Sequence, residues 1–293
     1  MPHYGVYGLN IESGIELPGL LPGDESGLPD VRIHEDSIAE SLPISATGTR
    51  SFEAQPQRVL VRLPGIGHLL ITDGNQIRVS LDAQDKRDAL ALFILNHGLA
   101  VLLMQRGILV LHAGVVLFNG KTVVIAGDTG SGKSTLLAYL QQQGGKVLAD
   151  EHCALDPGRG LTHPLSGAAS MQLWQPVIEE LDLPAANLTP VRQGFQKYFV
   201  PLDQPVDVPP LSALYVLNWQ EKGLPQKKLI SGGEKFSLLR QQVYQWPYVE
   251  GMGLAAEASQ SCMTMAAQVD VFQLARTKEL DQLQASADLL WKG

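Results

Sequence analysis

The chain of 293 residues has only two cysteines, Cys153 and Cys262, which lie far apart in the sequence. This scarcity argues against a secreted scaffold held together by disulfides. The chain also lacks a basic run, an RNA-binding signature and zinc-finger spacing, and its net charge is −8. Nucleic acid is therefore not an expected partner. Hydrophobic residues make up 45% and charged residues 18%, which is ordinary for a globular protein.

A long hydrophobic run is also missing. The longest apolar stretch, residues 89–103, is shorter than the roughly 20 residues that a spanning helix needs, and it contains Asn96 and His97. Residues 1–5 lack the basic and apolar regions of a signal peptide. We therefore expect a cytoplasmic protein without a membrane partner.

The chain does contain a glycine-rich stretch that fills the phosphate-binding pattern G-x-x-x-x-G-K-[ST] without a mismatch. Its residues are Gly127, Asp128, Thr129, Gly130, Ser131, Gly132, Lys133 and Ser134. An apolar, β-branched run (122–126) precedes it and a helix-forming run (135–140) follows, which predicts strand, loop and helix. A chance match is the alternative, because glycine-rich turns between strand and helix are common.

This order of elements has a chemical consequence. Glycines let successive loop amides turn inward around phosphate oxygens, and the positive end of the following helix dipole adds to the attraction. Lys133 would reach the β- and γ-phosphates, and the Ser134 hydroxyl would bind Mg²⁺. We predict that residues 127–135, including Thr135 in the first helical turn, bind a nucleotide.

The rest of the chain divides into two predicted domains, a β-rich N-terminal lobe (1–106) and a second domain (107–293). Runs with partial alternation, separated by turn residues, predict an antiparallel meander. These runs are 58–63, 68–71 and 76–81. The segment 85–106 is predicted to be one helix that ends the lobe, and 277–291 an amphipathic C-terminal helix.

A hairpin opens the second domain. Residues 108–118 and 121–126 read as strands joined by Asn119-Gly120, the strongest two-residue hairpin signal. In such a hairpin Phe118 faces Lys121, so His112 falls opposite Gly127 at the mouth of the loop. We therefore regard His112 as a candidate active-site residue. The alternative is a core histidine whose nitrogens bond to the backbone.

Two carboxylates follow the next predicted strand. The helix from Lys133 should end at Gly144-Gly145, and 146–149 should form a strand that leads into Asp150 and Glu151. Parallel strands joined by one helix end at the same edge of a sheet, which brings both acids beside the phosphates. One carboxylate can hold Mg²⁺ while the other accepts a proton from an incoming hydroxyl. A solvated acidic turn is the alternative.

Three segments carry a family resemblance: 111–116 (Leu-His-Ala-Gly-Val-Val), 127–134 and 148–151 (Leu-Ala-Asp-Glu). Together they resemble the ordered motifs of the catalytic domain of HPr kinase/phosphorylase and its stand-alone relatives, with the core of phosphoenolpyruvate carboxykinase as a more distant relation. The resemblance implies an α/β fold with a P-loop core and a small β-rich N-terminal lobe. It also implies that Lys133 and Ser134 bind nucleotide and Mg²⁺, that His112 lines the transfer site, and that Asp150 is the general base toward a serine. Glu151 departs from the family's second aspartate, and members of the family are often homo-oligomers.

Residues 192–201 also resemble a basic loop of that family, in which Arg192 or Lys197 could stabilise charge on the transferring group. A solvated basic turn is the alternative. Arg240 and Arg276 are further candidates. Trp174 follows Met171 at helical spacing and is predicted to be a core residue.

The leading hypothesis is therefore an ATP- and Mg²⁺-dependent kinase that phosphorylates a serine hydroxyl on a peptide or protein. Some stand-alone relatives of this size phosphorylate the C-terminal residue of a lasso-peptide precursor, and the layout of this chain is similar. Two alternatives stay open. One is a kinase for a small-molecule hydroxyl, and the other is a nucleotide-binding regulator without transferase activity.

Overall fold

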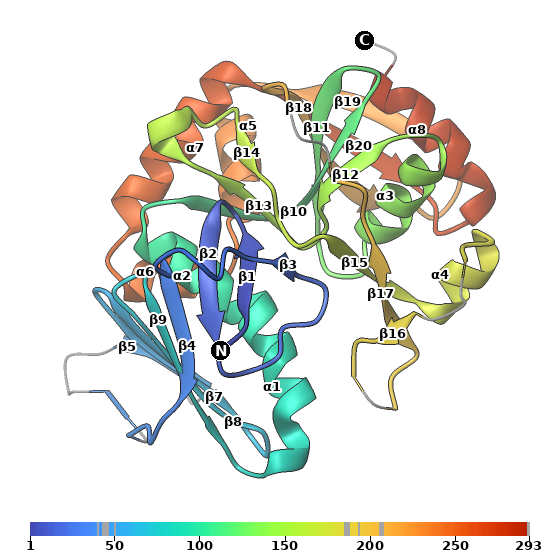
Figure 1. Cartoon of the computed structure of the whole chain (residues 1–293). Helices are drawn as coiled ribbons and strands as arrows, with labels where there is room; N and C mark the ends of the chain where they lie inside the picture. Colours follow the sequence, from blue (N-terminus) through green and yellow to red (C-terminus); the bar gives the residue numbers. More distant parts are fainter. Residues whose placement is uncertain are drawn as a thin grey trace.

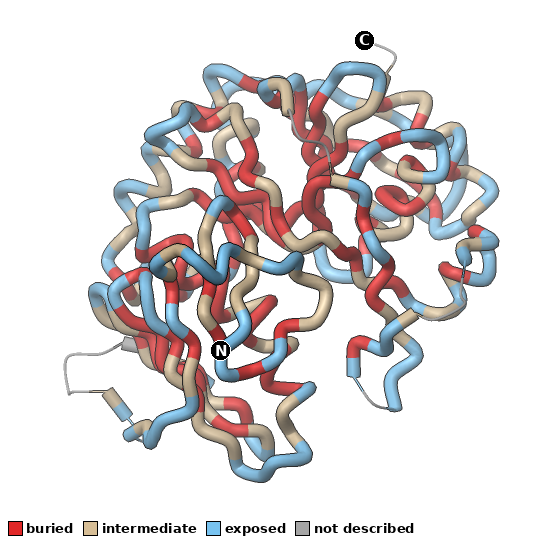
Figure 2. Tube along the Cα trace, in the orientation of Figure 1, coloured by how far each residue is buried: buried red, intermediate tan, exposed pale blue. Residues whose placement is uncertain are grey.

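The computed structural model describes residues 1–39, 41–42, 47–49, 51–184, 188–192, 194–204 and 208–291. It shows a mixed α/β protein in which two large sheets and one small sheet are accompanied by helices (Figure 1). The mixed α/β class agrees with the class predicted from the sequence. Buried residues concentrate along the strands and the central helix, whereas the turns are mostly exposed (Figure 2).

Nine strands near the N-terminus form the first large sheet, in the order β3-β1-β2-β4-β9-β8-β7-β6-β5. Their bounds are β1 His3–Val6, β2 Leu9–Ser13, β3 Leu21–Pro22, β4 Val31–Glu35, β5 Thr47–Gly48, β6 Phe52–Gln55, β7 Arg58–Leu63, β8 Gly67–Thr72 and β9 Gln76–Leu81. The predicted meander is confirmed, because β7, β8 and β9 pair in antiparallel fashion. The sheet as a whole is mixed, since β4 runs parallel to both β2 and β9.

One continuous helical segment follows this sheet. It comprises η1 Gln84–Lys86, α1 Arg87–Phe93, the π-helical turn η2 Ile94–Gly98 and α2 Leu99–Gln105. The predicted helix is confirmed in extent, but the π turn in its middle was not predicted. Helix α2 packs against β8 of the first sheet and β10 of the second. Among the described residues, the whole segment Gln84–Gln105 is the one helix long and apolar enough to cross a membrane. In its most apolar part, 72% is buried within the protein.

The second large sheet has eight strands in the order β14-β13-β10-β11-β18-β20-β19, with β12 paired to β10. Their bounds are β10 Leu109–Phe118, β11 Lys121–Gly127, β12 Lys146–Ala149, β13 His152–Leu155, β14 Pro164–Leu165, β18 Leu211–Trp219, β19 Gln226–Ile230 and β20 Asp270–Arg276. The predicted hairpin is present, because Phe118 pairs with Lys121. Strands β11, β18 and β20 are parallel neighbours, so their carboxyl ends share one edge.

Strands β11 and β12 run in the same direction, although they are not neighbours. Each pairs with β10 in antiparallel fashion, and β10 lies between them. Helix α3 (Lys133–Gln142) connects them and ends, as predicted, before Gly144, which adopts the left-handed φ of 90°. The end of β12 therefore reaches the same edge of the sheet as the loop after β11.

Successive side chains of β18 point to opposite faces of the second sheet, and each face packs against helices. Leu214 and Val216 join the larger core, to which Leu239 of α5 and Met265 of α7 also belong. Tyr215 and the other alternate residues join a second core beneath α3 and α8. Buried side chains on both faces are typical of a sheet between two helical layers. These helices are α5 Gly232–Gln241, α6 Trp246–Gly251, α7 Ala255–Gln268 and α8 Leu283–Trp291.

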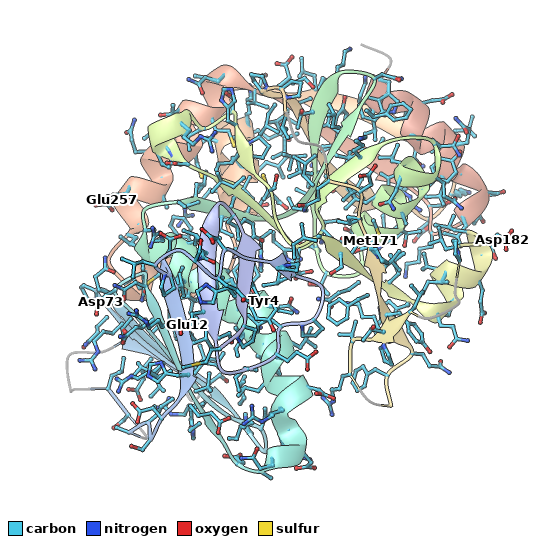
Figure 3. All side chains as sticks on the ribbon, viewed as in Figure 1. Tyr4, Glu12, Asp73, Met171, Asp182 and Glu257 are labelled. Carbon is cyan, nitrogen blue, oxygen red and sulfur yellow. The ribbon has the colours of Figure 1, made fainter. Side chains whose placement is uncertain are left out.

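A small third sheet completes the fold. Its strands are β15 Ser170–Trp174, β16 Thr189–Pro190 and β17 Lys197–Pro201, and α4 Gln175–Glu180 follows β15. Asp182 after α4 and Glu257 on α7 mark opposite edges of the molecule (Figure 3).

The predicted C-terminal helix is shorter than expected, because α8 is preceded by the 3-10 turn η4 Leu280–Gln282. The larger core contains residues of both predicted domains, so the boundary at 106/107 stays a prediction.

Candidate active site

The glycine-rich loop joins the carboxyl end of β11 to the N-terminus of α3. Gly127, Gly130 and Gly132 have positive φ angles of 137°, 82° and 85°, a backbone region that other residues rarely adopt. A Cβ atom on Gly127 would lie 2.9 Å from the Leu217 carbonyl oxygen of β18, so this position also needs the absence of a side chain. The order of strand, loop and helix is the one that the pattern predicts. Loop amides and the N-terminus of the following helix are the groups that bind phosphate in loops of this pattern.

Lys133 lies across this loop. Its Nζ donates hydrogen bonds to the carbonyl oxygens of Gly127 at 2.8 Å and Asp128 at 3.2 Å. Burial lowers the pKa of Lys133, while Glu151, Asp150 and Asp128 act in the opposite direction. The ammonium group is therefore held over the loop, near the place where phosphate oxygens would be alternative acceptors.

The other predicted loop residues differ in exposure. Asp128, Thr129 and Gly130 are exposed, and Ser134 and Thr135 are half-buried in the first turn of α3. Ser131 is buried, and no hydrogen-bond partner for its Oγ is found among the described residues. A buried hydroxyl without a partner is unusual, and it suits a site in which a ligand supplies the missing bond.

Asp150 is a buried carboxylate at the end of β12. Its Oδ2 accepts a hydrogen bond of 3.0 Å from the backbone amide of Gln172 on β15, and no partner for its Oδ1 is found among the described residues. Burial raises the pKa of Asp150, as does the neighbouring Glu151 charge, whereas the Ser134 hydroxyl, the Gln172 amide and the Lys197 charge lower it. The net direction is upward, which makes the Asp150 carboxylate a stronger base than an ordinary aspartate.

Glu151 has the opposite shift. Burial alone would raise its pKa, but attraction to His152, His112, Lys197 and Lys133 outweighs burial and lowers it. The Nε2 atom of His112 lies 3.6 Å from Oε1 of Glu151. Two adjacent carboxylates whose pKa values are pushed apart are suited to different tasks. This difference is in line with the predicted roles of Asp150 as a base and Glu151 as a metal ligand, both of which stay predictions.

His112 lies near the loop, and β10 and β11 pair in the predicted register. The recorded pairs end at Ala113 and Ala126, one step before His112 would face Gly127. On its other side β10 pairs with β13, where His112 lies opposite His152. Burial lowers the pKa of His112, and so does the nearby Lys133 charge, while Glu151 and Asp128 raise it. The electrostatic neighbours of His112 are therefore those of the loop and the acids.

Lys197 and Arg192, the two predicted basic residues, lie in different surroundings. Lys197 on β17 donates a hydrogen bond of 3.2 Å to Oε1 of Gln172, and its charge lowers the pKa of both acids. Arg192 is exposed, and its guanidinium stacks on Phe195 at 4.7 Å instead of facing the acids. Gln193 of the same segment lies outside the described residues. Of this pair, Lys197 is the one placed beside the site.

Trp174 is not a core residue, contrary to the prediction. Its side chain is 51% exposed at the end of β15, and Lys197 lies 5.8 Å from the centre of its ring. The spacing of Trp174 from Met171 predicts a helix, but the segment is strand β15. Residues an odd number of positions apart in a strand face opposite sides, so a buried Met171 leaves Trp174 outside.

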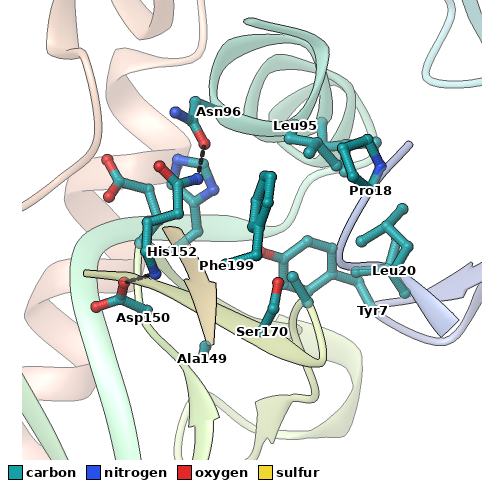
Figure 4. A pocket seen from close by; sticks show the side chains of 15 residues that line it. Tyr7, Pro18, Leu20, Leu95, Asn96, Ala149, Asp150, His152, Ser170 and Phe199 are labelled. Carbon is teal, nitrogen blue, oxygen red and sulfur yellow. Dashed lines mark hydrogen bonds between the residues drawn. The ribbon is translucent and has the colours of Figure 1, made fainter. Parts of the chain in front are cut away.

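A small pocket adjoins Asp150 (Figure 4). Its walls come from four parts of the chain: the N-terminal segment, the π turn, the acid segment after β12, and the small sheet. The lining residues that the sequence did not predict include Tyr7, Pro18, Asn96, Ser170, Gln172 and Phe199. The π turn η2 presents Asn96, whose Oδ1 accepts a hydrogen bond of 3.3 Å from Nε2 of Gln172. Such π turns are frequent at functional sites.

The N-terminal strand is tied to this pocket by the backbone. The amide of Tyr7 donates a hydrogen bond of 2.8 Å to the carbonyl oxygen of Ser166, which precedes β15. Tyr7 is buried, and burial raises the pKa of its hydroxyl well above the ordinary value. The tyrosine therefore stays neutral and forms a fixed wall of the pocket.

A cluster of rings lies behind the acids. The hydroxyl of Tyr244 is 3.1 Å from Nδ1 of His97, and the Tyr244 ring meets that of His152 edge-on at 4.5 Å. His152 is buried, and no partner for its Nε2 is found among the described residues. Burial lowers the pKa of His152 from 6.5 to about 4. His152 is therefore neutral at physiological pH.

This shift predicts an acid sensitivity. The unfolded chain takes up a proton at His152 near pH 6.5, but the folded chain does so only near pH 4. The free energy of unfolding should therefore fall as the pH drops from about 6.5 to about 4, by roughly 3 kcal/mol for this group. In His152→Phe this contribution should be absent. Urea unfolding of both proteins at pH 7.0, 5.5 and 4.5 measures it, and equal pH dependence in the two would contradict the assignment.

Fold and site together define a mixed α/β protein in which a glycine loop at a helix N-terminus faces two carboxylates. No family model matches the chain, and no curated protein matches it. Among solved structures, the HPr(Ser) kinase/phosphatase from Coxiella burnetii matches over 63% of this chain and 99% of its own chain, with 12% identity and a TM-score of 0.27. These values describe a distant structural relationship, so the roles of the residues below rest on the geometry of this site.

Proposed function

We propose that this protein is a Mg²⁺-dependent kinase that transfers the γ-phosphoryl group of ATP to a hydroxyl, most specifically a serine hydroxyl of a peptide or protein. The observation that carries the proposal is the position of Asp150. Among the described residues no partner is found for one oxygen of this buried carboxylate, and the Ser134 hydroxyl of the phosphate loop lowers its pKa. A base and a phosphate cradle so close together are what hydroxyl phosphorylation requires.

Each residue has a role in this proposal. The loop amides and Lys133 bind the β- and γ-phosphates, and Asp150 accepts the proton of the attacking hydroxyl. Bound Mg²⁺ would neutralise charge on the phosphates. Ser134 and Glu151 are the residues that would hold it. Among the described residues, no group of three or more His, Cys, Asp or Glu side chains could hold a metal alone. Mg²⁺ commonly uses one or two carboxylates and completes its coordination with phosphate oxygens and water, so Ser134 and Glu151 could hold it together with the nucleotide.

The pocket beside Asp150 is where an acceptor hydroxyl would approach the proposed base. Its lining includes Ser170, Gln172 and Phe199, so polar and apolar groups are both present. A serine side chain of a peptide is the acceptor that we propose. The C-terminal serine of a lasso-peptide precursor is one acceptor of this kind and belongs to the proposal.

Transfer of labelled γ-phosphate tests the proposal directly. The protein is incubated with Mg²⁺ and γ-labelled ATP in the presence of serine-bearing peptides, serine-bearing proteins and small alcohols, including sugars. Label on a peptide or protein serine is the expected result. Label on small alcohols alone would replace the acceptor with a small molecule. Binding of ATP with no transfer to any acceptor would favour a nucleotide-binding regulator.

A further inference from the structure

A single arginine lies buried behind the phosphate loop. Arg276 is the last residue of β20, where it pairs with Trp219 at the end of β18. Strand β18 in turn pairs in parallel with β11, so Gly127 stands beside Leu217. Arg276 therefore reaches the same edge of the sheet as the loop, two strands away from β11.

The guanidinium of Arg276 is almost wholly removed from water, and the described residues supply no counter-charge to it. The residue is 1% exposed, and no hydrogen-bond partner is found for Nε or Nη1 among the described residues. In the part of the chain that the structure describes, no carboxylate forms an ion pair with it. An arginine stays charged in proteins, and a buried charge without a partner is strongly destabilising. An arginine in this state indicates an anion that the site is built to receive.

Contacts of Arg276 show where that anion would bind. A Cβ atom on Gly132 would come within 3.0 Å of Nη1, so the guanidinium lies directly against the residue that caps the N-terminus of α3. Its Cζ is 5.2 Å from the ring centre of Trp219. The indole Nε1 of Trp219 donates a hydrogen bond of 3.2 Å to the carbonyl oxygen of Gly130. The stacked pair thus supports the loop at two of its glycines.

We propose that Arg276 binds the phosphate chain of the nucleotide from behind the loop, as a second cation opposite Lys133. The inference rests on the proposed function, because it assumes that the loop receives a polyphosphate. The helix N-terminus alone is a common feature, but here a buried guanidinium, whose Nε and Nη1 have no partner among the described residues, lies against it. The ligand class is an inorganic or nucleoside polyphosphate, whose oxygens accept the planar hydrogen-bond fork of arginine.

The proposal makes an unusual claim about stability. If the guanidinium has no counter-charge until an anion binds, removing the guanidinium should stabilise the protein without ligand, because a buried charge disappears. Arg276→Met keeps an unbranched side chain of similar reach without the charge. We expect a higher Tm for this variant than for the wild type in buffer free of phosphate and sulfate. We also expect pyrophosphate to raise the Tm of the wild type by far more than that of the variant.

Arg240→Met is the matched control. The sequence also made Arg240 a candidate, but the structure places it exposed on α5, where it stacks on Trp246 at 4.1 Å as Arg276 stacks on Trp219. Pyrophosphate binding by calorimetry should weaken about 10- to 100-fold in Arg276→Met and stay unchanged in Arg240→Met. Arg276→Lys keeps the charge without the planar fork and should lose affinity by an intermediate factor. The lysine variant also decides the question if the methionine variant does not fold.

The outcomes separate this inference from the proposed function. The role of Arg276 would be overturned if Arg276→Met bound pyrophosphate with wild-type affinity. If only Arg276→Lys folds, the same result in that variant would overturn it. Either result would leave the nucleotide site intact. A lower Tm of Arg276→Met in anion-free buffer would show that the guanidinium only supports the loop, which also overturns the inference. A wild-type protein that binds neither pyrophosphate nor ATP would overturn the nucleotide site and the role of Arg276 together.

Discussion

Phosphoryl transfer should fall about 10²- to 10⁴-fold when Asp150 is replaced by asparagine, the usual range for loss of a general base. Asparagine has nearly the same shape and retains an oxygen that can accept the hydrogen bond from the Gln172 amide. It cannot take a proton from the attacking hydroxyl. The decrease should therefore appear in kcat for labelled transfer, while the KM for ATP changes little.

Asp203→Asn is a suitable control for this variant. Its side chain is 87% exposed and lies 3.6 Å from Lys146, away from the loop, so the substitution changes the same functional group without touching the site. We expect wild-type transfer by the control. Undiminished transfer by Asp150→Asn would mean that another group, or the phosphate itself, accepts the proton.

The raised pKa of Asp150 adds a pH dependence of defined sign. The base must be ionised, so transfer should decrease as the pH falls through the pKa of Asp150. This pKa lies above the ordinary aspartate value of 3.8. Stability changes in the other direction. The wild type loses stability as the pH rises from 3.8 through the raised pKa, because only the unfolded chain ionises freely. Asp150→Asn does not ionise, so at pH 7 it should unfold at a higher urea concentration than the wild type.

Nucleotide binding should be affected most by Lys133→Met. The ammonium group is the cation that the loop holds over its own carbonyl oxygens, and methionine removes the charge while keeping the length. We expect at least a 10²-fold loss of transfer, comparable to the loss of one charge-stabilising donor in other enzymes, together with weaker ATP binding by calorimetry.

Lys121→Met provides the comparison for Lys133→Met. Lys121 is exposed at the start of β11, the end opposite the loop, so this change removes the same kind of charge without reaching the loop. Equal ATP affinity in the two variants would remove Lys133 from the nucleotide site. A loss confined to Lys133→Met would support the phosphate-binding role.

Local signals in the sequence predicted the loop and its supports. Asn119 and Gly120 have positive φ angles of 49° and 74°, as a two-residue hairpin requires, and this short turn places Phe118 opposite Lys121. Gly144 likewise ends α3 in the left-handed region. Each of these features depends on residues a few positions apart, for which the energetics are contained in the local sequence.

The surroundings of the acids depend on distant segments and were not predicted. Tyr7, Asn96 and Gln172 reach the pocket from three different sheets or helices, and none belongs to a motif. The π turn that presents Asn96 leaves no clear pattern in an apolar run. The sequence offered Arg276 only as a further basic candidate. Tertiary packing alone reveals that it is buried, with no partner for its Nε and Nη1 among the described residues.

The hydrogen bond between Tyr7 and Ser166 has a consequence for biosynthesis. The two residues are 159 positions apart, yet their bond holds Tyr7, which lines the pocket, against the segment that precedes β15. A ribosome adds roughly 5–20 residues each second, so Tyr7 emerges about 8–30 s before its partner. During that interval the N-terminal segment must remain unaggregated without this bond. The pocket beside Asp150 can thus form only after the small third sheet has been translated.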